Sequence, residues 1–348
     1  MYGAKEFYAV LLLTTILGFQ FCDSIIVNRA TLNSEEWTSY VSTYGKTYVN
    51  GPVPEAYALY YYNYNKKLIT AHNVKADRYP DKITYRLGIN QFTDMRLIHF
   101  NALFPKTTPP TTAPSATTAP QVQDASPSFD FITDLLLTIT AENQGTVCNS
   151  GWAYATAKAV EIREAIETGI TTRLSAQNLI DCAGSGTGCT RQVAQTAFEY
   201  LVGNQRPLYS ETDYPNTPLL STQGMCLTPT AATATSVTLA SYSRIDNPTD
   251  DTIMKYVSAE FPVVILYDPT SFDFMHYKSG IFQQPHTYGG SHYMVVVGYG
   301  TDATLNLDYW LVLNSFGTTW GENGFIRIKR ETTKPLTTLA LFPNALSP

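Results

Sequence analysis

The chain has 348 residues, of which 44% are hydrophobic and 15% charged, and this length suits one large domain or two smaller ones. A wholly disordered chain is excluded, because 13% of the residues are aromatic and 24 are tyrosines. The net charge of −6 shows no basic excess. Nucleic acid and anionic membranes are therefore not expected as partners.

Residues 1–22 are predicted to be an export signal. Lys5 precedes the apolar run Phe7–Phe19, which is too short to span a bilayer and lies where the hydrophobic part of a signal peptide belongs. Cleavage after Cys22 or after Ser24 fits the small residues before those positions. No later segment reaches the roughly 18 apolar residues of a spanning helix, so no membrane span is expected. The destination is then extracellular or a lysosome-like vacuole.

Residues 30–100 are predicted to be helical, because charged and aromatic residues are mixed there at helical spacing. Residues 104–127 are predicted to form a linker. Within it, residues 107–120 hold six threonines and four prolines, which cannot form a core and keep the chain extended. Such a composition is also typical of an O-glycosylated, mucin-like stalk.

Residues 128–340 have the composition of a globular domain, with a helical half to about residue 235 and a β-rich half after it. Ala153–Ile166 is Ala-rich with its charges on one side, which predicts a helix. Four short apolar runs predict strands, at Pro262–Leu266, Tyr293–Val297, Tyr309–Leu313 and Phe325–Ile328. The fold class is therefore α+β.

Ordered motifs in the globular part resemble the papain-like cysteine peptidases, the cathepsin family. Gln144–Ala153 resembles the nucleophile segment of that family, Ser291–Gly300 its histidine strand and Asn314–Phe325 its asparagine segment. The resemblance covers roughly residues 128–335. It implies a papain-like fold of two subdomains, a helical half and a β-barrel-like half.

The N-terminal part resembles the inhibitor-type (I29) prosegment of cathepsin L-like members. Six residues follow the spacing of the prosegment helix, namely Glu55, Leu59, Tyr62, Asn65, Ile69 and Asn73. Gly88–Asp94 matches the second prosegment motif. In active relatives this module runs backwards through the cleft and blocks it until it is removed, and the resemblance implies the same arrangement here.

The resemblance also assigns the catalytic positions. Gln144 is the donor to the oxyanion, His292 receives the proton and Asn314 orients that histidine. The nucleophile position, immediately before Trp152, is occupied by Gly151. Cysteine peptidase chemistry needs a thiolate, and glycine has no side chain that could attack a carbonyl.

The five cysteines bear on whether the chain has a nucleophilic thiol, since an odd number in a secreted protein suggests one cysteine outside a disulfide. By resemblance, Cys148 pairs with Cys189 and Cys182 pairs with Cys226. The fifth, Cys22, lies in or beside the export signal. No free thiol is then expected in the mature chain.

Several other cleft positions depart from the family pattern. Arg191 and Gln192 replace two glycines of the wall on which substrate backbone pairs, and side chains there should obstruct it. Tyr293 replaces the usual alanine beside the main specificity pocket, and Phe316 replaces the tryptophan that shields the histidine. The predicted cleft residues are Trp152, Arg191, Gln192, Tyr293, Phe316 and Trp320.

These observations predict a secreted, monomeric papain-like homologue that is not an enzyme and binds a peptide, a protein or a protease inhibitor. Two alternatives stay open. One is an active cathepsin-type endopeptidase that uses another residue, such as Cys148 or Ser150, or has a miscalled codon at position 151. The other is a protease inhibitor acting through its prosegment. No cofactor is expected, and no metal, because the other histidines, His72, His99, His276 and His286, lack metal-ligand spacing with a free cysteine.

Overall fold

The structure is a computed structural model that describes residues 34–48, 53–183, 188–190, 192–203, 205–216, 224–230, 233–283, 292–331 and 334–347. The predicted export signal with Cys22 lies outside these residues, as do Arg191, His286 and Ser291. Within the described residues, no helix is both long enough and apolar enough to cross a membrane.

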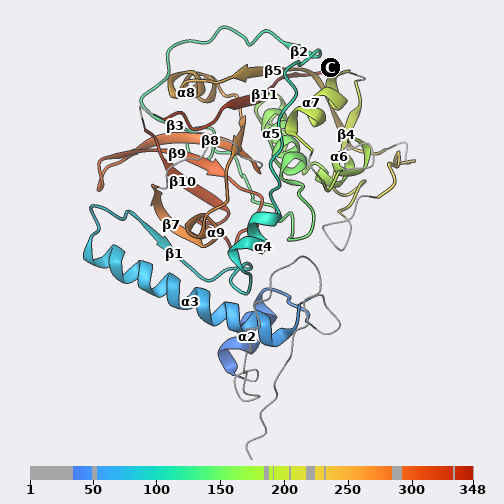
Figure 1. Cartoon of the computed structure of the whole chain (residues 1–348). Coiled ribbons are helices and arrows are strands. Elements are labelled where there is room, and N and C mark those ends of the chain that lie inside the picture. The colour runs from blue at the N-terminus through green and yellow to red at the C-terminus, as the bar shows by residue number, and fades with distance from the viewer. Residues whose placement is uncertain are drawn as a thin grey trace, which may run out of the picture.

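The helices form two groups, one before and one after the Thr/Pro-rich segment (Figure 1). The first group is α2 (Glu35–Thr43), α3 (Glu55–Arg78) and α4 (Leu97–Ala102). The second group is α5 (Gly151–Thr168), α6 (Ala176–Cys182), α7 (Ala194–Gly203), α8 (Asp250–Ser258) and α9 (Phe272–Met275). The predicted helix at Ala153–Ile166 is confirmed by α5.

The strands join into one twisted sheet in the order β1-β7-β10-β9-β8-β6-β11-β5-β2, with β3 on β8 and β4 on β5. The early strands are β1 (Tyr85–Leu87), β2 (Ala116–Thr117), β3 (Phe129–Asp130) and β4 (Pro207–Tyr209). The later ones are β5 (Ser236–Asp246), β6 (Val263–Tyr267), β7 (Tyr277–Phe282), β8 (His292–Asp302), β9 (Leu307–Leu313), β10 (Phe325–Lys329) and β11 (Leu339–Leu346). All four predicted strands are present, as β6, β8, β9 and β10.

The core lies where α5 packs on the sheet. All five residues of β6 are buried, and so are the first nine of β8. Such continuous apolar runs are expected for strands that are covered on both faces. Because α5 is rich in alanine, it can approach β8, β6 and β11 closely, and it ends at Gly169, whose φ of +72° suits glycine. This contact places the first turn of α5 against the start of β8.

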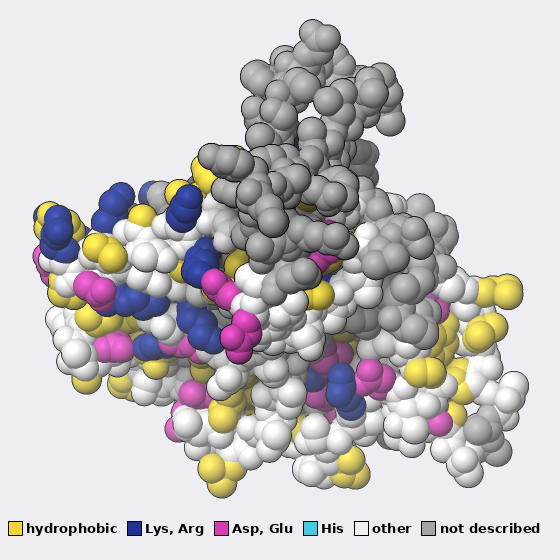
Figure 2. Space-filling model, turned by 90° about the horizontal axis from the view of Figure 1, so that it is seen from below, with side chains coloured by type: hydrophobic (Ala, Val, Ile, Leu, Met, Phe, Trp, Pro, Cys, Tyr) yellow, Lys and Arg dark blue, Asp and Glu magenta, His cyan; other side chains and the backbone are white. Residues whose placement is uncertain are grey.

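The N-terminal helices form a module with a small aromatic core of its own. Trp37 and Tyr40 of α2 pack on Tyr62 of α3, with ring centroids 4.6 to 5.5 Å apart. The module reaches the main domain through β1, which pairs with β7. Figure 2 views the molecule from the side of α2 and α3, where basic, acidic and hydrophobic side chains lie intermixed among the coloured atoms.

The Thr/Pro-rich segment is extended, and it lies on the domain rather than standing free as a stalk. It passes over α7, pairs with β5 through β2, crosses α8 and enters the sheet as β3 (Figure 1). Ser115 N–H donates to the Glu199 carboxylate, and Lys255 pairs with Asp124. The prolines remove backbone donors, but the carbonyls and side chains of the segment still find partners on the domain.

Candidate active site

Gly151 is the first residue of α5 and faces the side chain of His292. A Cβ built at Gly151 would lie 2.7 Å from His292 Nδ1 and 2.8 Å from its Cε1. The same point is 3.1 Å from Gln144 Oε1. The structure therefore brings together the nucleophile position, the histidine and the glutamine that the sequence predicted to share one site.

His292 is held by Asn314, whose amide orientation can be worked out. Ser315 N–H donates to Asn314 Oδ1 over 2.8 Å, and a backbone N–H can only donate. The atom that accepts this bond must be the amide oxygen. His292 Nε2 lies 2.7 Å from the same oxygen, so Nε2 carries the proton. His292 Nδ1 is then an unprotonated acceptor, and it has no partner among the described residues.

The ring of His292 is fully buried between two aromatic side chains. Phe316 stacks on it with the centroids 4.9 Å apart, and Phe104 meets it edge-on at 5.1 Å. Burial penalises the imidazolium, which lowers the pKa of His292 to about 4, although the Asn314 bond acts in the opposite direction. In this structure the histidine is therefore neutral at physiological pH.

Gln144 stays beside Gly151 despite the extra residue in its segment. Its N–H donates to Ser315 O over 2.9 Å, and its Oε1 accepts a 2.6 Å bond from Ser315 Oγ. Oε1 is also the Gln144 atom nearest the side-chain position of Gly151, so the acceptor end of the amide faces that position in this structure. Ser150 is fully buried, and its Oγ donates to Cys148 O over 3.4 Å, so the geometry gives it no base.

A buried ion cluster fixes this segment to α5. Lys158 Nζ lies 2.9 Å from Glu142 Oε1 and 2.5 Å from Glu161 Oε1, and all three side chains are less than a tenth exposed. Burial alone would lower the pKa of Lys158, but the two carboxylates outweigh that effect and raise it. Glu142 O also accepts from Gly317 N, so the cluster ties the residues before Gln144 to those after Asn314.

Both disulfides expected from the resemblance are present. Cys148 is bonded to Cys189 and Cys182 to Cys226. The first bridge lies just before α5, and Trp152 Nε1 donates to Gly188 O beside it. The described part of the chain therefore holds no cysteine outside a disulfide.

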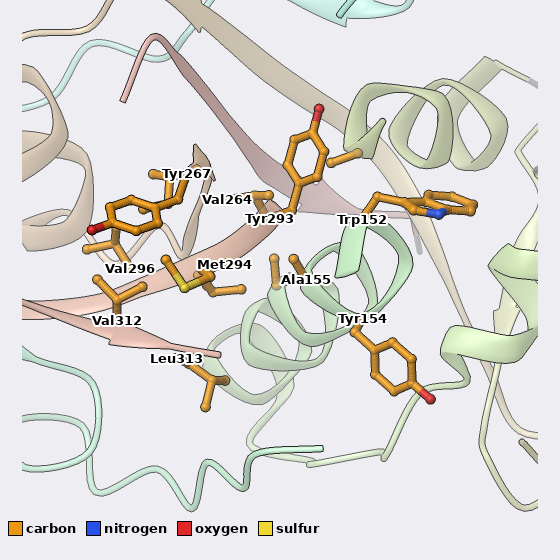
Figure 3. Packing of buried hydrophobic residues seen from close by; sticks show 14 of the residues in the cluster. Trp152, Tyr154, Ala155, Val264, Tyr267, Tyr293, Met294, Val296, Val312 and Leu313 are labelled. Carbon is orange, nitrogen blue, oxygen red and sulfur yellow. The ribbon is translucent and has the colours of Figure 1, made fainter. Parts of the chain in front are cut away.

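The remaining predicted cleft residues occupy different environments. Tyr293 is buried and projects from β8 near the first turn of α5, which carries Trp152 (Figure 3). Trp320 is buried and meets Phe316 edge-on at 5.5 Å. Gln192 is partly exposed, while Arg191 lies outside the described residues. That these side chains obstruct substrate stays a prediction.

Sequence reasoning missed Phe104, Gln91 and the Lys158 cluster. Gln91 Nε2 donates to Phe316 O over 2.5 Å and its Oε1 accepts from Thr319, which fastens the N-terminal module beside the site. The spacing of Phe100 and Phe104, four apart just before the Thr/Pro-rich run of residues 107–120, was the available signal for an apolar face directed at the domain. Within the described residues, no group of three His, Cys, Asp or Glu side chains is placed to hold a metal.

Comparison with known proteins agrees with this geometry. Residues 126–341 match the profile of the family described as papain family cysteine protease. "Probable cysteine protease RDL6" of Arabidopsis thaliana is 34% identical over 302 residues, which are 85% of this chain and 80% of that protein. Cathepsin L of Sarcophaga peregrina is 30% identical over 317 residues, 87% of this chain and 90% of the relative.

Solved precursor structures share the fold over both parts of the chain. Digestive procathepsin L 3 of the Tenebrio molitor larval midgut has a TM-score of 0.72 at 28% identity, covering 89% of this chain and 98% of its own. The recombinant stem bromelain precursor has a TM-score of 0.74 at 27% identity, with the same coverage of the two chains. The papain-like α+β fold is thereby confirmed.

The comparisons correct one prediction. The sequence predicted that the chain is not an enzyme, because residue 151 is glycine, no free thiol was expected and several cleft positions depart from the family pattern. The matched family consists of peptidases, the relatives are named as cysteine proteases, and no finding is a positive sign of inactivity. These departures at the site were too narrow a basis for assigning the class of the whole chain. This chain belongs to the papain family of cysteine proteases.

Proposed function

We propose that this chain is a secreted papain-type protease precursor whose site recognises extended peptides, with peptide-bond hydrolysis as its class of reaction. The observation that carries the proposal is that the domain already holds an extended polypeptide at this site, namely its own segment from Phe104 to Ser126. Phe104 covers His292, and the residues that follow lie across α7, β5 and α8.

The domain holds this segment largely through main-chain groups. Gln195 Nε2 donates to Thr112 O and Arg244 Nη1 donates to Pro110 O, both over 2.5 Å. Tyr256 Oη donates to Pro120 O over 3.0 Å. Bonds to backbone carbonyls tolerate many side chains, which is what a site for varied peptide sequences requires.

The family resemblance supplies the proposed roles at the site. Asn314 orients His292, His292 transfers protons, and Gln144 donates to the developing oxyanion together with the N-terminus of α5. The arrangement of Nε2 on Asn314 and Nδ1 toward Gly151 supports these roles. The residue before Trp152 contributes only backbone, so the nucleophile has to come from elsewhere.

Secretion and a removable prosegment belong to the same proposal. Two disulfides suit an oxidising compartment. The separate aromatic core of α2 and α3 favours a second candidate function, inhibition of related proteases by the released prosegment. Inhibition of a cathepsin L by the isolated N-terminal fragment would support it, and unhindered activity would exclude it.

Peptide recognition is tested on the full chain after a specific cut in the linker. A protease recognition site inserted between Ser126 and Pro127 allows the folded precursor to be cut and the whole segment up to Ser126 to be separated. Calorimetry then measures binding of a synthetic peptide that copies residues 100–126. Arg244→Ala should weaken binding about tenfold or more, because a hydrogen bond from a charged group is lost.

Arg163→Ala is the matched control, because Arg163 lies on the far part of α5 and pairs with Glu167 instead of the segment. It should leave the affinity unchanged. If the cut chain does not bind the peptide, or if Arg244→Ala binds as well as the parent, the proposed recognition is wrong.

A further inference from the structure

We propose that the surface formed by α7, β5 and α8 is an exosite, a peptide-binding surface apart from the residues around His292, which selects proteins that carry an extended, proline-rich segment. In this structure the protein's own residues 110–126 fill the exosite. The inference rests on the proposed peptide recognition and names the class of substrate that the domain takes.

The exosite lies along the segment beyond the part that covers His292. Phe104 contacts His292, with the ring centroids 5.1 Å apart. The hydrogen bonds of the exosite begin six residues later, at Pro110. An extended chain of six residues spans up to roughly 20 Å. In Figure 1 the segment runs from α4 past α7 to β2, at the end of the molecule opposite α2 and α3. The exosite therefore holds a different part of a polypeptide from the part that lies at His292.

The polar groups of the exosite on α7 and β5 are held in place by the domain itself. Gln195 is 2% exposed, and its Oε1 accepts a hydrogen bond from the Arg244 guanidinium. Asp246 also holds Arg244, with Oδ1 and Nη2 2.7 Å apart. Glu199 accepts a 2.5 Å bond from Tyr242 Oη, and the Tyr242 side chain is fully buried. Because neighbouring side chains orient these groups, little conformational entropy is lost when they bind a peptide.

The donors of the exosite bind groups that proline keeps. Three side chains of the domain each donate to a backbone carbonyl of the segment: Arg244 to Pro110, Gln195 to Thr112 and Tyr256 to Pro120, over 2.5, 2.5 and 3.0 Å. Proline retains its carbonyl group but has no N–H group. A proline on this surface can therefore accept these bonds, and it brings no N–H group that would need an acceptor of its own.

Pro114 sets a tight turn of the segment over α7. Ala116 N–H donates to Ala113 O over 3.0 Å, which closes a β-turn with Pro114 as its second residue. Proline is favoured there because its ring fixes φ at the value that the turn needs. The turn directs Ser115 N–H to the Glu199 carboxylate, 3.2 Å away, and leads into β2, which pairs with β5. A peptide with proline at this position is therefore already shaped for the exosite.

Beyond the turn, every third residue of the segment meets the domain. Ala116, Ala119 and Ala125 pack against the core, and Val122, which belongs to the same series, is partly buried. Residues 118–126 belong to no helix or strand. A polyproline II helix has three residues per turn, so contact at every third residue is typical of that conformation. Because prolines stiffen a chain in this conformation, the exosite fits a proline-rich chain better than a flexible one.

The exosite selects substrates by tethering them. A protein held by its proline-rich part keeps the adjoining chain near His292, and a short flexible link gives that chain an effective concentration in the millimolar range. Proteins without such a segment lack this advantage. The residues around His292 then need little sequence preference of their own, because the exosite supplies the choice of substrate.

The test uses the cut chain described above, after the segment has been separated, and calorimetry with a peptide that copies residues 107–126. This peptide lacks Phe104, so its binding reports on the exosite alone. Replacing its four prolines by alanine should weaken binding about tenfold or more, because each proline reduces the entropy that the free peptide loses on binding. The matched control peptide changes three exposed side chains and should bind with nearly unchanged affinity; it carries Thr108→Ala, Thr111→Ala and Thr118→Ala.

Variants of the domain place the binding on the exosite. Tyr256→Phe removes the hydroxyl group that donates to Pro120 O and should weaken binding of the parent peptide about two- to tenfold. Tyr309→Phe is the matched control, because the Tyr309 ring lies beside Arg327 on β9, and it should leave the affinity unchanged. The uncut chain should not bind the peptide, because its own segment fills the exosite.

A second measurement needs no separation of the segment. Hydrogen exchange of the Ser115 N–H group in the intact chain reports how firmly the segment is held, since this group donates to Glu199. Replacing the four prolines of residues 107–126 by alanine in the intact chain should speed this exchange about tenfold or more. An unchanged exchange rate would overturn the inference.

Three binding results would also overturn the inference while leaving the proposed recognition in place. The first is binding of a peptide that copies residues 100–126 without binding of the shorter peptide, since recognition would then lie at His292. The second is equal affinity for the parent and the proline-free peptide. The third is equal binding by the cut and uncut chains, or by Tyr256→Phe and the parent. Absence of binding by either peptide would instead show that the proposed function itself is wrong.

Discussion

Lys158 is predicted to stabilise the folded structure around the site more than any other side chain there. Its ammonium group lies between the carboxylates of Glu142 and Glu161, and all three groups are less than a tenth exposed. Lys158→Met keeps the length of the side chain but leaves two neighbouring buried carboxylates without a cation. Removing one partner of a buried ion pair typically costs about 3–5 kcal/mol.

The assay is equilibrium unfolding of the full chain in urea. With a slope of about 3 kcal/mol per molar, that loss lowers the midpoint by about 1 to 2 M. Lys158→Met combined with Glu142→Gln should recover part of it, since one uncompensated charge is removed. Lys255→Met, which removes a partly exposed lysine whose partners Asp124 and Asp251 are exposed, should leave the midpoint nearly unchanged. A midpoint for Lys158→Met within about 0.3 M of the parent would refute the reasoning.

Three further predictions follow from the contacts of buried histidines and of Gly151. Phe104→Ala should raise the pKa of His292 from about 4 toward its ordinary value, because burial lowers that pKa. NMR titration of the His292 ring measures the change. An unchanged pKa would show that Phe104 does not seal the site. Gly151→Ala should lower the urea midpoint, because overpacking against His292 costs about 1–3 kcal/mol. The higher helix propensity of alanine returns less than about 1 kcal/mol. A higher midpoint would mean that the His292 ring moves away freely. Burial also lowers the pKa of His276 to about 4. The stability that comes from its neutral form is therefore fully present above about pH 6.5 and is lost as the pH falls toward 4. His276→Gln should flatten the dependence of the unfolding free energy on pH in this range, and an unaltered slope would contradict the prediction.

The sequence predicted the main elements well where the signal was local. Alanine periodicity located α5, and short apolar runs located β6, β8, β9 and β10, because a buried strand or a packed helix face leaves a direct trace in composition. β5, β7 and β11 were missed. β5 and β7 carry polar residues at several positions, and β11 contains Pro343, so their strand character comes from neighbours in the sheet.

The site was predicted as a set of residues but not as an arrangement. Gln144, Gly151, His292 and Asn314 came from family motifs, and their proximity is a property of the fold. The seal formed by Phe104 and the cluster around Lys158 depend on contacts between residues far apart in the chain, which no single segment encodes. The prediction of a chain without enzymatic function was wrong for a related reason, since it used a few site residues and the cysteine pairing where the whole domain defines the class.

The tautomer of His292 is the property on which the proposed proton transfer by this residue depends, since only an unprotonated Nδ1 can accept a proton at position 151. Nitrogen-15 NMR of the full chain, with His292→Ala used to assign the signal, reads the two ring nitrogens directly. The structure predicts a proton on Nε2 and none on Nδ1 at neutral pH, persisting until the pH falls to about 4. A proton on Nδ1, or an imidazolium at neutral pH, would contradict the account.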